Sequence, residues 1–154
     1  MARQRSIFSL VLVVLATFLI SCSGSNVAAV PPTYTSAQLQ RIQEYVPDIQ
    51  EIRTRGDELQ KLIETNEWVK VGNFIHGPMA ELKLDMSYIA PNLLPNDQPT
   101  ARKITRDMFS SLVQIDQAAT VGNKKVALNN YVTAFNKIDE FLKLMPDTST
   151  SEKS

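Results

Sequence analysis

The chain has 154 residues, with 16 basic and 16 acidic side chains and a formal net charge of zero. This balance argues against nucleic acid or an acidic lipid surface as the main partner. A single cysteine excludes an internal disulfide, and a single histidine leaves few side chains for nucleophilic or metal chemistry.

Residues 1–21 predict a bacterial lipoprotein signal peptide. A basic start is followed by an apolar run of 14 residues, 7–20, which is too short to span a bilayer comfortably. The run ends in Leu19-Ile20-Ser21-Cys22, which resembles the lipobox of bacterial lipoproteins. That resemblance implies cleavage before Cys22 and lipid attachment to its thiol. An ordinary signal peptide or an uncleaved anchor is the alternative.

The mature chain would begin at Cys22. Without the two arginines of the signal peptide it carries 14 basic and 16 acidic residues, a formal charge of −2. Residues 22–36 are rich in Ser, Ala, Pro and Thr, and they predict a lipidated, flexible tether. The polar end, 147–154, predicts a disordered tail. Residues 37–146 between them predict one helical domain.

The first helical pattern covers residues 37–64. Apolar residues recur every three or four positions, as they do on one face of a helix. Pro47 interrupts the pattern because proline lacks the N–H and crowds the preceding turn, so the helix either kinks or begins there. Gly56 stands where the stripe expects an apolar side chain, and a close helix crossing would explain it.

The second pattern covers residues 66–89. Pro78, which follows His76 and Gly77, is expected to kink this helix and to free a backbone carbonyl. Trp68, at its start, predicts a side chain that plugs one end of a bundle. The stretch 91–99 carries three prolines and must be a connection.

The third pattern begins after Asn96 or Asp97, both suitable N-caps, and Gly122-Asn123 stops it. The fourth covers residues 124–145, and Pro146 closes it. No part of the mature domain alternates with a period of two. We therefore predict an all-α fold, an antiparallel up-down-up-down four-helix bundle preceded by a signal peptide and a flexible tether.

The domain is poor in residues for catalysis or metal binding, so we expect no enzyme activity, no cofactor of its own and no metal site. His76 is the one histidine, and its place beside Gly77-Pro78 favours a ring that caps the freed carbonyl or meets solvent. A metal held by His76 and a carboxylate stays open.

Two groups of cations suggest contact with an acidic partner. Arg102, Lys103 and Arg106 open the third helix, where positive charge opposes the helix dipole. They are the candidate partner-binding residues. Arg53 and Arg55 form a second group near Gly56. A solvated helix face is the alternative for both groups.

A set of short blocks runs in order along residues 34–146: Trp68, Ile75-His76-Gly77-Pro78, Leu93-Leu94-Pro95-Asn96-Asp97-Gln98, Ala101-Arg102 and Phe141-Leu142-Lys143-Leu144-Met145-Pro146. Together they resemble the PsbQ family in its cyanobacterial lipoprotein form. One stretch departs from it, because Lys137-Ile138-Asp139 stands where the family often has Asp-Phe-Asp. An acidic contact at Lys137 is therefore in doubt.

The resemblance implies a non-enzymatic extrinsic subunit of photosystem II, lipid-anchored on the lumenal side of the cyanobacterial thylakoid membrane. Its partners would be the photosystem II core and other lumenal extrinsic subunits. It would stabilise the oxygen-evolving complex near the manganese–calcium cluster and aid the retention of calcium and chloride. The alternative function is a free-standing lipoprotein bundle that binds a small ligand or a metal.

Overall fold

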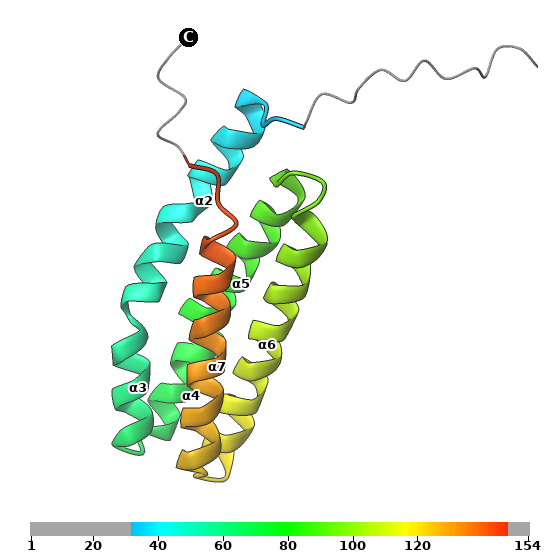
Figure 1. The fold of residues 1–154 in the computed structure, drawn as a ribbon. Coiled ribbons are helices and arrows are strands. Elements are labelled where there is room, and N and C mark those ends of the chain that lie inside the picture. Colours follow the sequence, from blue (N-terminus) through cyan, green and yellow to red (C-terminus); the bar gives the residue numbers. More distant parts are fainter. Residues whose placement is uncertain (1–31, 148–154) are drawn as a thin grey trace, which may run out of the picture. The chain divides into compact units, whose positions relative to one another are not determined.

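The computed structural model describes residues 32–147 (Figure 1). The predicted signal peptide, Cys22 and most of the predicted tether and tail lie outside these residues. The described residues hold no strand, so the all-α class is confirmed for this part of the chain. The elements are α2 Ser36–Thr54, α3 Gly56–Glu64, α4 Trp68–His76, α5 Pro78–Ile89, the 3-10 turn η1 Ala90–Asn92, α6 Gln98–Thr120 and α7 Lys124–Leu142.

These helices make four rods around one apolar core. α2 and α3 follow each other along the first rod, and α4 and α5 follow each other along the second. α6 and α7 are the third and fourth rods and lie side by side (Figure 1). Each rod packs against the next, and α7 returns to α2 and α3. The predicted apolar stripes face inward, since Ile49, Leu59, Leu82, Met108 and Ile138 are fully buried.

Pro47 lies inside α2, so the alternative that the helix begins at this proline is wrong. The helix starts at Ser36 because Thr35 and Gln38 form a capping box. The Thr35 hydroxyl accepts from the Gln38 N–H at 3.3 Å, and the Gln38 side chain accepts from the Thr35 N–H at 3.0 Å. This cap fixes the start of α2 well before the proline, and burial of the apolar face carries the helix through it.

The first rod breaks at Arg55 instead, although the pattern predicts one helix there. Gly56 opens α3, and a Cβ at this position would lie 2.5 Å from Cε1 of Phe135 on α7. The missing side chain lets α3 approach α7 closely. The predicted close crossing at Gly56 is therefore confirmed, while the single helix over 37–64 is wrong.

The second rod breaks where the sequence predicts an interruption. α4 ends at His76, and Pro78 is the first residue of α5. The Gly77 N–H donates to the Asn73 carbonyl at 2.9 Å, and the Gly77 carbonyl accepts from the next turn of α5. Both backbone groups of Gly77, the residue between the two helices, are thus hydrogen-bonded.

The end of the bundle near Trp68 also follows the sequence prediction. Gly122 has φ of +69°, a left-handed conformation that suits glycine, and it separates α6 from α7. The Asn123 side chain accepts from the Val126 N–H and caps α7. Trp68 packs against the core, with its indole nitrogen beside Gly122. Its predicted role as an end plug is confirmed.

Two finer boundaries differ from the predicted ones. α7 ends at Leu142, three residues before Met145, because the last three residues form a turn instead of a further helical turn. Asp97 holds the N-cap position of α6, but its side chain makes no capping hydrogen bond. Among the described helices, none combines the length and apolar character that a membrane span requires.

Candidate docking surface

The connection before α6 positions the candidate docking residues. The Gln98 amide donates to the carbonyls of Pro91 and Leu93 at 3.1 and 2.9 Å, and Leu93 is fully buried. These bonds fold the proline-rich connection back onto the first turn of α6. The start of α6 is therefore held in place although the Asp97 side chain does not cap it.

Arg102, Lys103 and Arg106 are all exposed on α6, but their surroundings differ. Lys103 donates to the Asp107 carboxylate at 2.5 Å, and this bond lowers the pKa of Asp107. Arg102 donates to the Gln98 side chain at 2.9 Å. Arg106 makes no hydrogen bond or ion pair with the side chains that the structure describes. The three cations are therefore not equivalent.

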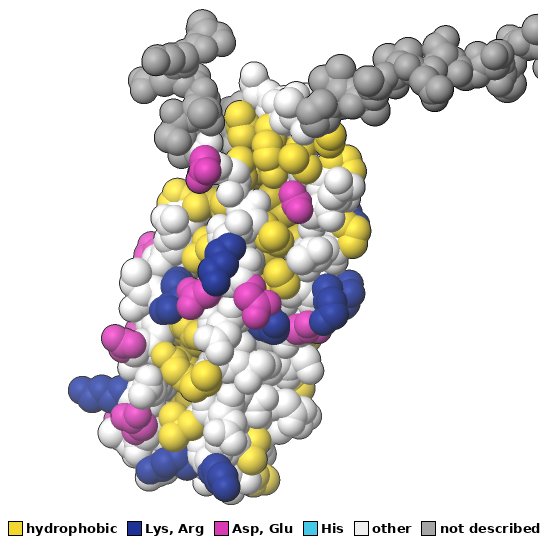
Figure 2. All heavy atoms as spheres, in the orientation of Figure 1, with side chains coloured by type: hydrophobic (Ala, Val, Ile, Leu, Met, Phe, Trp, Pro, Cys, Tyr) yellow, Lys and Arg dark blue, Asp and Glu magenta, His cyan; other side chains and the backbone are white. Residues whose placement is uncertain are grey.

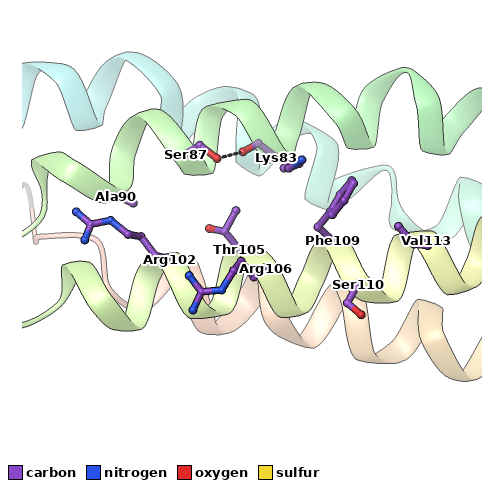
Figure 3. A pocket seen from close by; sticks show the side chains of 9 residues that line it. All are labelled: Lys83, Ser87, Ala90, Arg102, Thr105, Arg106, Phe109, Ser110 and Val113. Carbon is purple, nitrogen blue, oxygen red and sulfur yellow. Dashed lines mark hydrogen bonds between the residues drawn. The ribbon is translucent and has the colours of Figure 1, made fainter.

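Arg102 and Arg106 line a groove between α5 and α6, and Lys103 does not (Figure 3). The groove has a volume of about 690 Å³. Its further lining residues are Lys83, Ser87, Ala90, Thr105, Phe109, Ser110 and Val113.

Lys83 and Phe109 are groove residues that the sequence patterns did not reveal. The Lys83 ammonium lies 3.6 Å from the centroid of the Phe109 ring, and Phe109 is 40% exposed. A cation above an aromatic face is attracted to it without neutralising its charge. One sequence feature could have pointed to the groove. Phe109 is an aromatic residue outside the apolar stripe of α6, one helical turn after Arg106.

The other pair of cations is engaged within the bundle. Arg53 forms a two-point bond with Asp139 of α7, at 2.6 and 3.0 Å, and its guanidinium lies over the Phe135 ring. The bond lowers the pKa of Asp139 and raises that of Arg53. Arg55 binds Glu58 and lies over Phe74. These arginines join elements of the fold, so an acidic partner would have to compete with Asp139 and Glu58 for them.

The stretch that departs from the family pattern takes part in this network. Asp139 is the partner of Arg53, while Lys137 donates to Glu140 at 2.7 Å. Figure 2 shows the face of the bundle on which α7 lies, and there the basic and acidic side chains alternate. This face therefore has no field of a single sign.

His76 pairs with an acidic residue on the neighbouring rod. Its Nε2 lies 3.0 Å from Oδ1 of Asp116 on α6, and its side chain is 71% exposed. The ring meets solvent as predicted, but it does not cap the carbonyl freed by Pro78. Within residues 32–147, no group of three or more His, Cys, Asp or Glu side chains could hold a metal ion.

Acidic residues line a pocket between α2 and α5. Asp48, Glu51, Glu81 and Asp85 line it together with Arg55. Burial raises the pKa of Asp85, and the charges of Asp48 and Glu81 raise it further. This crowding disfavours the ionised form of Asp85.

Comparison with known proteins adds to this geometry. A family model described as PsbQ, oxygen evolving enhancer protein 3, matches residues 2–146. The chain is also 38% identical over 150 residues to CyanoQ of Synechocystis sp., covering 97% of this chain and 100% of that protein. The chain belongs to the PsbQ family. The resemblance found in the sequence blocks is thereby confirmed.

In this PsbQ-family member, the blocks that carry the resemblance have structural roles. The Ile-His-Gly-Pro block forms the break between α4 and α5 and supplies the ring that bonds to Asp116. The Leu-Leu-Pro-Asn-Asp-Gln block forms the connection that Gln98 ties to α6. These two blocks thus shape the connections between helices, whereas the groove residues Lys83 and Phe109 lie outside all the blocks.

Proposed function

We propose that this PsbQ-family chain is a non-enzymatic, lumenal extrinsic subunit of photosystem II. It would bind and stabilise the oxygen-evolving complex and aid the retention of calcium and chloride. The observation that carries the proposal is the likeness to CyanoQ over that protein's whole length, together with the family's description as an oxygen evolving enhancer. A surface groove lined by three cations and by no acidic residue supports a binding role.

The proposal includes a lipid on Cys22 that holds the chain at the cyanobacterial thylakoid membrane. The apolar run before Cys22 and the lipobox-like sequence support it. We also infer that successive rods run antiparallel, because the short links 65–67, 93–97 and 121–123 leave little chain for a return along the bundle.

Ion retention would follow from preferential binding. A subunit that binds the assembled, ion-loaded complex more tightly than the depleted one shifts the equilibrium toward the loaded state, by no more than the difference in affinity. Abundant calcium and chloride would hide this effect, because mass action then keeps the sites filled. The subunit needs no catalytic group of its own for this role.

The test is oxygen evolution in a strain that lacks the chain. We expect near-normal rates in complete medium and a loss that deepens when calcium or chloride is scarce. Re-introduction of the unaltered chain is the control and should restore the rate. Rates and cluster stability equal to wild type in ion-depleted medium would refute the retention role.

The lipid anchor has a separate test. Cys22→Ser should stop lipid transfer and release or mislocalise the protein, whereas Ser23→Ala should leave it in the detergent phase in phase partitioning. Two or more acyl chains are needed for stable anchoring. An unaltered protein that partitions wholly into the aqueous phase would contradict the anchor.

A second candidate function is a free-standing bundle that binds a small ligand. The groove of about 690 Å³ favours it, because pockets for small molecules have comparable volumes. Purification in mild detergent separates the two functions. A photosystem subunit should travel with photosystem II, and a free-standing ligand binder should not.

A further inference from the structure

The lining of the α5–α6 groove is positively charged. Three of its lining residues are cations, namely Lys83, Arg102 and Arg106, and none of the described residues that line it is acidic. Arg106 makes no hydrogen bond or ion pair with the described side chains, although its charge helps to lower the pKa of Asp107, and Lys83 faces an aromatic ring in place of a carboxylate. Elsewhere on the bundle, most cations with a described partner bind acidic residues of this chain. The cations of the groove are therefore available to bind acidic groups of another molecule.

The two ends of the groove differ in chemistry. Arg102 and Arg106 lie at one end, while Phe109 and Val113 lie toward the other, with the Phe109 ring pointing from α6 toward α5 (Figure 3). The residues from Arg102 to Val113 span about 16 Å of helix at 1.5 Å per residue. An extended segment of about five residues has the same length.

The hydroxyl groups along the groove present acceptors. Ser87 donates its proton to the Lys83 carbonyl at 2.7 Å, and Thr105 donates to the Ala101 carbonyl at 2.9 Å. With its proton committed, the Ser87 oxygen can accept a hydrogen bond from an occupant. A peptide backbone supplies N–H donors for such an acceptor, whereas lipid acyl chains supply none.

We propose that this groove binds an extended acidic segment of a neighbouring photosystem II protein. Carboxylates of the segment bind Arg102 and Arg106, and an apolar side chain packs on Phe109. This assignment rests on the proposed function. It differs from the set of candidate residues suggested by the sequence in one position. Lys103 is bound to Asp107 and lies outside the groove, and Lys83 is the third cation of the groove.

The first test measures binding of the full lipidated protein to photosystem II purified from a strain that lacks it. Arg102→Gln with Arg106→Gln should weaken binding at least about tenfold, which corresponds to about 1.4 kcal/mol. Lys61→Gln with Lys125→Gln, exposed residues on α3 and α7, is the matched control because it removes the same charge. That control and Lys103→Gln should bind as the unaltered protein does.

The salt dependence of binding gives an independent measure. Affinity of the unaltered protein should fall as salt rises, and that of the arginine variant should fall less, because two charge contacts are already lost. All variants should keep the unaltered melting temperature. Equal binding by the arginine variant and the unaltered protein would overturn the groove assignment and leave the proposed function standing. Failure of the unaltered protein to bind would overturn both.

The second test identifies the occupant. A photo-crosslinking benzoylphenylalanine in place of Phe109, introduced in cells, should form adducts with an acidic segment of a photosystem II subunit. The same probe in place of Val132, an exposed apolar residue on α7, is the positional control. Adducts at position 109 with phosphatidylglycerol alone, or with a second copy of this chain alone, would overturn the assignment.

Discussion

The close crossing at Gly56 yields a sharp prediction for Gly56→Ala. The added methyl carbon would lie 2.5 Å from Cε1 and 2.9 Å from Cδ1 of Phe135. Carbon atoms pack at about 3.5–4.0 Å, so either the ring or α3 must move by about 1 Å. Phe135 is 5% exposed, its ring centroid lies 4.6 Å from that of Tyr131, and the Arg53 guanidinium lies above it. The ring therefore has little room to retreat.

We expect Gly56→Ala to lower the free energy of unfolding by about 1–3 kcal/mol, the usual cost of overpacking. The backbone itself favours alanine, because Gly56 has no positive φ, and this gain offsets part of the loss. Gly72→Ala on α4 is the matched control. Its Cβ would meet only Asp116 Oδ1 at 3.9 Å, an ordinary contact, so it should stabilise by about 0.4–1 kcal/mol.

Urea unfolding followed by circular dichroism at 222 nm measures both variants. The double variant Gly56→Ala with Phe135→Leu should regain part of the loss, because a smaller side chain faces the new methyl group. If Gly56→Ala were as stable as Gly72→Ala, the close approach of α3 and α7 would not be a constraint, and the reasoning would be refuted.

Three further predictions concern the core and the charged groups. Leu112→Ala or Ile138→Ala, both buried, should cost about 2–5 kcal/mol in urea unfolding, and a loss below about 1 kcal/mol would mean that the site is not core. Arg53 lowers the pKa of Asp139, so this pair stabilises the fold above the ordinary carboxyl pKa of 3.8 and the contribution is lost as pH falls through the lower folded value. Asp139→Asn should therefore lose less stability than the unaltered protein between pH 5 and pH 2, as measured by melting temperature. The pKa of Asp85 is raised, chiefly by burial, so its ionised form opposes folding at pH 7. Asp85→Asn should stabilise there by less than about 1 kcal/mol, with no gain at pH 3.

The sequence predicted those features that depend on neighbouring residues. Apolar periodicity predicted the helical segments, because burial of one helix face repeats every three to four positions. Pro78 and Gly122 marked an interruption and a turn through their own backbone chemistry. Each signal lies within a few residues of the feature it predicts, and the structure bears these predictions out.

Contacts between residues that are far apart in the sequence could not be predicted from such local patterns. The break at Arg55 accompanies a contact between Gly56 and Phe135 on another rod, and the pattern around Pro47 pointed elsewhere. Arg53 and Asp139 are 86 residues apart, and no spacing rule joins them. The groove likewise needs Lys83 from α5 beside Phe109 from α6. Only packing of the rods brings these residues together.

The division of the cations explains why charge along the sequence is a poor guide to docking. Arg53 and Lys103 already bind carboxylates of this chain, so a partner would have to displace an existing pair and would gain little. Arg106 has no such bond among the described side chains, and a carboxylate brought to it forms a new charge-assisted hydrogen bond. Affinity should therefore depend on which cation is removed, and not on the net charge of the chain.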